Sequence, residues 1–210
     1  MSLYDCTFIR NYATSNGGAV AAVGEAPDDW EIFNCTFIDN SANDCGGAFY
    51  SHAEQSMGSI INSTFINNRA RVGAAIYNYG YTGTIDRCIF VNNTANSMIY
   101  GYYADGMIVS NSIIVNNYGD NLIDIPNPII DNKWWGTTAD DTEAPVVSGL
   151  TLTNYYILNM TVDDDSADIT LNNLYDNGVI TTSYDRYVLP SINLTLKGNN
   201  VEIAGSVARG

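Results

Sequence analysis

The sequence has few basic residues, a single histidine and no long apolar run. It contains 8 Lys and Arg against 23 Asp and Glu, which gives its 210 residues a formal net charge of −15. Nucleic acid and anionic lipid both require a basic surface that displaces counterions, so neither is an expected partner. Because His52 is the only histidine, a metal cage of several histidines is excluded. No stretch approaches the roughly 20 apolar residues of a membrane helix, so we expect no membrane contact by this chain.

The chain also has little charge, and its polarity comes from uncharged groups. Charged residues make up 15% of it, below the usual level of about 25%. The hydrophobic fraction of 46% argues against a disordered acidic tail. The sequence holds 26 Asn, 18 Gly and 17 Thr. Asn and Gly are typical of turns and Thr of strands, so the composition predicts an all-β protein.

A repeat occupies the first two thirds of the chain. Its copies are LYDCTFIRN from Leu3, IFNCTFIDN from Ile32, IINSTFINN from Ile60, IDRCIFVNN from Ile85 and a weaker VSNSIIVNN from Val109. Their aligned apolar column is Phe8, Phe37, Phe65, Phe90 and Ile114, and their polar column is Asn11, Asn40, Asn68, Asn93 and Asn117. The first three copies continue as GGAVA, GGAFY and GAAIY. Units of this size with short β-type segments indicate a solenoid.

The repeat predicts a right-handed parallel β-helix of about five coils over residues 1–138. One coil cannot bury its apolar face, but coils stacked at about 4.8 Å bury a continuous column. Phe and Ile should fill the interior. The recurring Asn suits a turn in which its amide bonds to the Asn of the next coil and to turn backbone. The Gly pairs allow a corner that a Cβ would block.

One stretch of the repeat, NCTFIDNSANDCGGAFY, resembles the repeat of Asn/Thr-rich adhesin-like surface proteins of methanogenic archaea. More loosely, its GGA and FxxN signatures resemble the polymorphic outer-membrane protein repeat. The resemblance covers roughly residues 3–138 and implies a cell-surface location. These motifs are specific for the fold and weak for any activity. Because the chain opens inside a repeat, we expect it to be a fragment of a longer protein.

Beyond the repeat the pattern changes. In DNKWWGTT, Trp134 and Trp135 suit a last coil that covers the open end of the solenoid. Residues 139–145 are polar and acidic and predict a linker. Residues 146–210 show alternating strands separated by turns, which is typical of a small antiparallel β-sandwich. This part resembles the Ig-like domain that follows the β-helix in the methanogen family, and its last strand can be incomplete at Gly210.

The four cysteines fit no metal motif, because no C-x-x-C is present. Cys6 and Cys35 would lie in adjacent coils at a distance that could just permit a disulfide. The same column accepts Ser63 and Ser112, which favours a small buried filler. We therefore expect free thiols.

Tyrosines form the most informative candidate site. Aligning GAAIYNYGYTG with NSMIYGYYADG places Tyr77 on Tyr100 and Tyr79 on Tyr102, and Tyr50 joins the first column. One interpretation is an aromatic ladder that only stabilises neighbouring coils. The other is a flat glycan-binding strip in which weak contacts repeat along the coils. Tyr79 and Tyr102 are its better candidates, because Tyr77 and Tyr100 directly follow Ile76 and Ile99.

Two acidic runs are weak candidates for calcium binding. They are Asp140 and Asp141 in the linker, and Asp163, Asp164 and Asp165 in the second region. A solvated acidic loop is the more ordinary interpretation. We expect no cofactor and no other metal.

These features predict a non-enzymatic, monomeric fragment of a cell-surface adhesin-like protein. The β-helix would be a stalk and a contact surface for glycans or other cells, and the Ig-like part a spacer. The alternative is a polysaccharide-active β-helix domain, a lyase or a glycoside hydrolase. Such enzymes resemble one another in acidic clusters paired with a basic residue. Here the nearest basic pair is Arg69 and Arg71, at the turn after the Asn column, so we expect no catalysis.

Overall fold

The computed structural model describes residues 1–24, 29–53, 57–80, 83–115, 117–132 and 134–137, and strands within 156–207. All of the regular elements among them are β-strands. No helix able to span a membrane occurs in the part of the chain that the structure describes.

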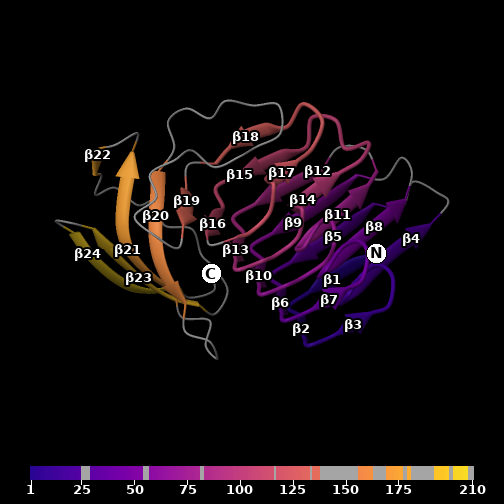
Figure 1. Ribbon diagram of the computed structural model, residues 1–210, viewed down its shortest axis with the longest axis horizontal. Helices are drawn as coiled ribbons and strands as arrows, with labels where there is room; N and C mark the ends of the chain where they lie inside the picture. The colour runs from indigo at the N-terminus through magenta and orange to yellow at the C-terminus, as the bar shows by residue number, and fades with distance from the viewer. Residues whose placement is uncertain are drawn as a thin grey trace.

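Three parallel sheets enclose the core, and each gains one strand per repeat (Figure 1). Sheet 1 consists, in spatial order, of β1 (Ser2–Tyr4), β5 (Trp30–Phe33), β9 (Gly58–Ile61), β12 (Gly83–Asp86), β15 (Ile108–Ser110) and β18 (Ile129–Asp131). Sheet 2 begins with β2 (Thr7–Ile9), β6 (Thr36–Ile38), β10 (Thr64–Ile66), β13 (Ile89–Val91), β16 (Ile113–Val115) and β19 (Trp134–Thr137). Sheet 3 consists of β4 (Val20–Gly24), β8 (Phe49–Ala53), β11 (Ile76–Tyr79), β14 (Ser97–Gly101) and β17 (Asn121–Asp124). A short pair, β3 (Tyr12–Ala13) with β7 (Ser41–Ala42), completes the first two coils.

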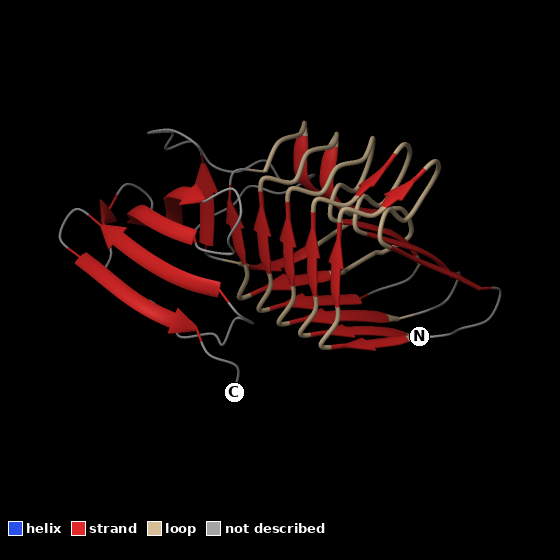
Figure 2. Ribbon diagram, turned by 90° about the horizontal axis from the view of Figure 1, so that it is seen from below, coloured by secondary structure: helices blue, strands red, loops and turns tan. Residues whose placement is uncertain are grey.

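This arrangement is a parallel β-solenoid, as the repeat predicted, and Figure 2 shows its coils stacked with equivalent strands aligned. The predicted apolar column lies inside. Phe8, Phe37, Phe65 and Phe90 stack with ring centroids 4.8–5.0 Å apart and ring planes within 9° of parallel. Phe37, Phe65 and Phe90 are fully buried. Ile114 pairs with Phe90 and continues the column.

The corner between sheets 1 and 2 is made by one residue in a left-handed conformation. This residue has φ between 49° and 56° in all five copies: Asp5, Asn34, Asn62, Arg87 and Asn111. Asn and Asp adopt this conformation more readily than other non-glycine residues, which explains their predominance here. A second corner uses glycine: Gly46 has a φ of +67°, and a Cβ on Gly47 would lie 2.3 Å from the carbonyl oxygen of Ala74.

The predicted asparagine ladder is present at the end of sheet 2. The Oδ1 atom of Asn68 accepts hydrogen bonds from the backbone N–H and from Nδ2 of Asn40, at 3.0 and 3.1 Å. Its own Nδ2 donates to the carbonyl of Phe37 and to Oδ1 of Asn93. The same bonds recur from Asn11 to Asn117. Each asparagine thus bonds to the coils on both sides, and Asn40, Asn68 and Asn93 are fully buried.

The Cys/Ser column is also internal. All four cysteines are free thiols. The Sγ atoms of Cys35 and Cys88 lie 3.3 Å from the carbonyl oxygens two residues earlier, where Ser63 and Ser112 place their hydroxyls at 2.9 and 2.8 Å. The Ser63 hydroxyl additionally accepts the backbone N–H of Cys35. Cys and Ser therefore substitute for one another as small buried donors.

Beyond the coils, sheet 2 continues through a parallel pairing of β19 with β20 (Tyr156–Val162). The sheet then adds β21 (Ile169–Asp176), β22 (Val179–Ile180), β23 (Ile192–Gly198) and β24 (Val201–Val207). The β20–β21 and β23–β24 pairs are antiparallel, and β21–β23 is parallel. All strands described in this region belong to one sheet, so the Ig-like sandwich stays a prediction. The predicted linker, 139–145, lies outside the described residues. At the boundary, Trp135 pairs with Ile114 and takes the next register position of the core column.

The ladder generates a stability prediction. Asn68→Ala leaves two buried donors of Asn40 without an acceptor, and each such loss costs about 1–3 kcal/mol. We expect the free energy of unfolding to fall by about 3 kcal/mol, measured by urea denaturation. Asn96 is exposed, so Asn96→Ala is the matched control and should change stability by less than about 0.5 kcal/mol. Equal stability of the two variants would contradict the ladder.

Candidate functional site

The predicted tyrosine columns lie on the outward face of sheet 3. Along β8, β11 and β14, residues alternate between the core and the surface. Ile76 pairs with Ile99 inside, and Tyr77 pairs with Tyr100 outside, as predicted. We define the tyrosine strip as Tyr50, His52, Tyr77, Tyr79, Tyr100, Tyr102 and Tyr103. Tyr81, in the aligned stretch GAAIYNYGYTG, lies outside the described residues.

The strip contains two stacked columns. In the first, the ring centroids of Tyr50, Tyr77 and Tyr100 are 5.2 and 5.1 Å apart. In the second, the ring centroids of His52 and Tyr79 are 4.3 Å apart, and those of Tyr79 and Tyr102 are 5.1 Å apart. The parallel register between coils produces this spacing directly.

The stacking of the tyrosine rings determines which parts of each ring are exposed to solvent. The planes of Tyr79 and Tyr102 differ by 7°, so these rings turn their faces largely toward one another. The stacked rings therefore expose mainly their edges to solvent. Tyr103 stands nearly perpendicular to both rings, at 79° and 80°. Tyr102 and Tyr103 are the most exposed members, at 47% and 55%.

The first column is partly withdrawn from water. Burial raises the pKa of Tyr77 well above its usual 10, and the nearby Cys45 and Tyr100 raise it further. Burial also raises the pKa of Tyr50 and of Tyr100. These phenols therefore stay neutral at physiological pH. The preference for Tyr79 and Tyr102 as ligand contacts stays a prediction.

Of the two arginines named for the enzymatic alternative, Arg71 has a structural partner. Arg71 Nε donates to Asp44 Oδ1 at 2.8 Å, which joins two successive coils at the surface. This pair lies next to Cys45, where burial raises the pKa of the thiol to about 11. Arg71 is thus engaged in a coil–coil contact.

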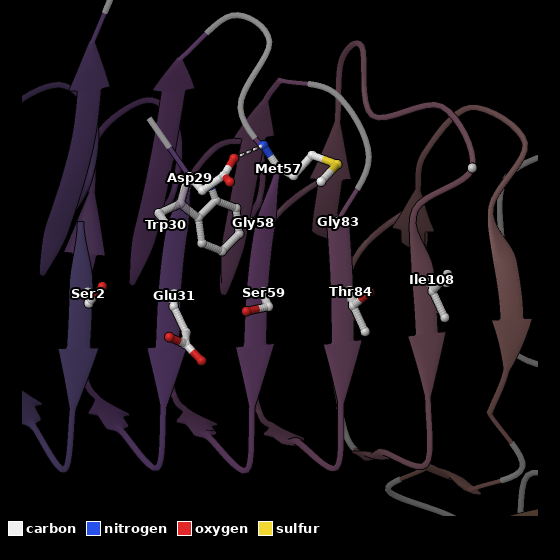
Figure 3. Close-up of a pocket in the computed structure, with 11 residues that line it drawn as sticks. Ser2, Asp29, Trp30, Glu31, Met57, Gly58, Ser59, Gly83, Thr84 and Ile108 are labelled. Atoms are coloured by element: carbon white, nitrogen blue, oxygen red, sulfur yellow. Dashed lines mark hydrogen bonds between the residues drawn. The ribbon is translucent and has the colours of Figure 1, made fainter. Parts of the chain in front are cut away.

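A hollow of about 600 Å³ lies on the outward face of sheet 1 and was not anticipated from the sequence. Its lining residues are Ser2, Asp29, Trp30, Glu31, Met57, Gly58, Ser59, Gly83, Thr84, Gly106 and Ile108. Figure 3 shows one outward row, Ser2, Glu31, Ser59, Thr84 and Ile108, with one residue on each of five adjacent strands.

Three glycines, Gly58, Gly83 and Gly106, are among the lining residues of this hollow. Trp30 points inward and packs on Phe49, with centroids 4.8 Å apart. Its indole ring lies over Gly58, where a Cβ would approach ring atoms to 2.0 Å. Gly83 pairs with Gly58 in the next coil. Around Gly106, which has a φ of +71°, a Cβ would meet no atom within 4 Å.

Two carboxylates lie toward the first coils. Asp29 Oδ1 accepts the backbone N–H of Met57 at 3.0 Å, and the Tyr4 hydroxyl donates to Glu31 Oε2. That hydrogen bond, followed by burial and the carboxylate charge, raises the pKa of Tyr4. No lysine or arginine lines the hollow among the described residues.

Comparison with known proteins finds one family whose repeat is similar to the coils. Residues 5–23, 34–52 and 62–79 match the family model of the Chlamydia polymorphic membrane protein (Chlamydia_PMP) repeat. These three coils are similar to that repeat. The repeat family is associated with outer-membrane surface proteins. Comparisons with curated proteins and with solved structures found no match. The predicted resemblance to this repeat is confirmed, and the resemblance to surface proteins of methanogenic archaea stays a prediction.

The matched segments contain part of the tyrosine strip and none of the hollow. Each segment runs from the left-handed corner through sheet 2 and the asparagine ladder into sheet 3. Tyr50, His52, Tyr77 and Tyr79 fall inside these segments, whereas every residue lining the hollow falls between or beyond them. The repeat pattern therefore accounts for the scaffold and not for the hollow.

The calcium candidates are not placed by the structure. Asp140, Asp141, Asp163, Asp164 and Asp165 all lie outside the described residues. Elsewhere in the described chain, no group of three or more His, Cys, Asp and Glu side chains could hold a metal ion.

The raised pKa of Tyr77 predicts a pH dependence. Its folded-state pKa exceeds the unfolded value of about 10, so the stability it contributes is complete below pH 10 and is lost as pH rises through the folded pKa. The melting temperature should therefore fall less steeply above pH 10 in Tyr77→Phe than in the parent. Thermal melts between pH 8 and about 11 test this. Tyr12→Phe, at an exposed position outside the strip, should follow the parent profile, and the same profile for Tyr77→Phe would refute the prediction.

Proposed function

We propose that this chain is a non-enzymatic part of a cell-surface, adhesin-like protein of the kind found in methanogenic archaea. The solenoid serves as a stiff stalk whose outward faces contact glycans or other cells. The region after Pro145 serves as an Ig-like spacer. The protein works as a monomer and needs no cofactor.

One observation carries this proposal: the repeat is similar to that of outer-membrane surface proteins, and its characteristic side chains hold the coils together. The Phe rings stack, and the asparagine side chains form hydrogen bonds, between adjacent coils. A scaffold of this kind extends by adding coils, and each added coil repeats the same outward surface. That property suits a stalk with many weak contacts, because avidity rises with their number.

The second column of the tyrosine strip is the proposed contact surface. Tyr79, Tyr102 and Tyr103 form a corner of rings in which Tyr103 stands nearly perpendicular to the other two, and Tyr102 and Tyr103 are exposed. Aromatic rings with polar tips suit sites where one side is apolar and the other wet. Such an open strip binds weakly and lacks the enclosure that transition-state stabilisation needs.

Binding to glycan arrays and to intact cells tests the proposal. The Tyr79→Ala, Tyr102→Ala variant should lose at least about tenfold in apparent affinity. Tyr12 and Tyr118 are exposed tyrosines outside the strip, so the Tyr12→Ala, Tyr118→Ala variant is the control and should bind as the parent does. Undiminished binding by a folded strip variant would exclude the strip as the contact surface. A parent protein that binds neither glycans nor cells would contradict the proposed adhesive function.

The enzymatic alternative is tested on the same protein. Incubation with pectin, alginate and glycosaminoglycans should release no new reducing ends and no unsaturated products. Turnover that a single Asp or Arg substitution abolishes would overturn the non-enzymatic assignment.

A further inference from the structure

We propose that the hollow on sheet 1 is a separate binding site for one extended saccharide chain built of neutral or amino sugars. This site is independent of the tyrosine strip, since it lies on another sheet and uses none of the strip's residues.

The shape of the hollow selects a single extended chain. Its outward row takes one residue from each of five successive coils, so at about 4.8 Å per coil it is roughly 19 Å long. A volume of about 600 Å³ over that length leaves a mean cross-section of about 30 Å². An α-helix, about 10 Å across with its side chains, would extend well beyond this mean cross-section, whereas an extended chain can follow the row. The strands beneath are already paired on both sides within sheet 1, so a peptide cannot bind here as an added strand.

The chemistry of the lining matches a sugar chain. The hydroxyls of Ser59 and Thr84 stand at the middle of the row and can donate to and accept from sugar hydroxyls. Apolar surface is supplied by Met57 and by Ile108, while the indole of Trp30 is buried beneath the lining and packs on Phe49. A site with largely apolar walls and a few polar groups that fix orientation is typical of small-ligand recognition.

Two glycines of the lining are required by the packing of adjacent coils. At Gly58 the indole of Trp30 takes the place of a Cβ, and at Gly83 a Cβ would lie 2.7 Å from the carbonyl oxygen of Gly58. Neither glycine has a positive φ, so backbone conformation does not require them. Both therefore serve close packing beneath the hollow, and the ligand contacts come from the outward row.

Charge sets the class of sugar. Asp29 and Glu31 are the charged side chains of the lining, and the chain as a whole carries a net charge of −15. A uronate chain would be repelled, whereas a neutral chain is accepted and an ammonium group gains a favourable partner. Glu31 is half-buried in the outward row between Ser2 and Ser59, so its carboxylate faces the ligand's path.

The position of the hollow relative to the repeat supports a dedicated role. All its lining residues lie outside the three segments that match the repeat model. The matched repeat motif therefore does not explain why Ser59 and Thr84 line up here.

Three tetrasaccharides of equal length but different charge test the site by calorimetry: glucosamine, N-acetylglucosamine and galacturonic acid. The first two should bind and the third should not. Thr84→Lys places a long cationic side chain in the hollow and should weaken the binding of the glucosamine and N-acetylglucosamine tetramers at least about tenfold. The matched control is Thr36→Lys, because Thr36 is likewise half-buried and outward, on β6 of sheet 2. This control should not change the affinity for either tetramer.

Glu31→Gln separates charge from shape. It should weaken the glucosamine tetramer at least about fivefold and leave the N-acetylglucosamine tetramer within about twofold. The Tyr79→Ala, Tyr102→Ala variant should bind both tetramers as the parent does, which keeps this test distinct from the one for the strip. Equal binding of galacturonate, no binding of any tetramer, preference for a lysine-containing extended peptide, or full affinity in a folded Thr84→Lys protein would each overturn the proposal.

Discussion

The asparagine ladder is the constraint on which the rest of the fold depends. Asn40, Asn68 and Asn93 are fully buried, and each hydrogen-bonds to the next through Oδ1 and Nδ2. A buried amide without partners is costly, so the coils must stack in one register for every amide to be satisfied. That register in turn places the phenylalanine rings 4.8–5.0 Å apart inside and the tyrosines about one strand spacing apart outside.

Because the interior is fixed by the repeat, the outward faces of the sheets are where coils can differ. Sheet 3 uses this freedom for stacked tyrosines, of which Tyr50 and Tyr77 lie within the matched segments. Sheet 1 uses it for an outward row that includes Ser59 and Thr84 and lines the hollow. The two surfaces offer different contacts: ring edges and phenols on an open strip, and hydroxyls with carboxylates in a narrow groove. Under the two proposals, a stalk with both surfaces would bind more than one feature of an extended glycan or a neighbouring cell.

Much of the scaffold could be predicted from the sequence, because residues that repeat every 24 to 29 positions in a solenoid become neighbours. The Phe column, the asparagine ladder and the pairing of Tyr79 with Tyr102 follow from that alignment. The orientation of the tyrosine rings could not be predicted, since register sets their spacing and packing sets their planes. The hollow was missed because Gly58, Ser59 and Thr84 belong to no repeated motif. Only their positions on adjacent strands bring them together. The pairing of the strands after Pro145 could not be predicted, because strand lengths and turn residues do not specify which strands are neighbours in a sheet.

Native-state hydrogen exchange, read amide by amide, tests the central claim most directly. The backbone N–H groups of Asn40, Asn68 and Asn93 donate to side-chain oxygens of the next coil and not to another backbone group. If the ladder fixes the register of the coils, these three amides exchange as slowly as those of the buried strands β10 and β13. Exchange as fast as that of exposed turn residues would contradict the account.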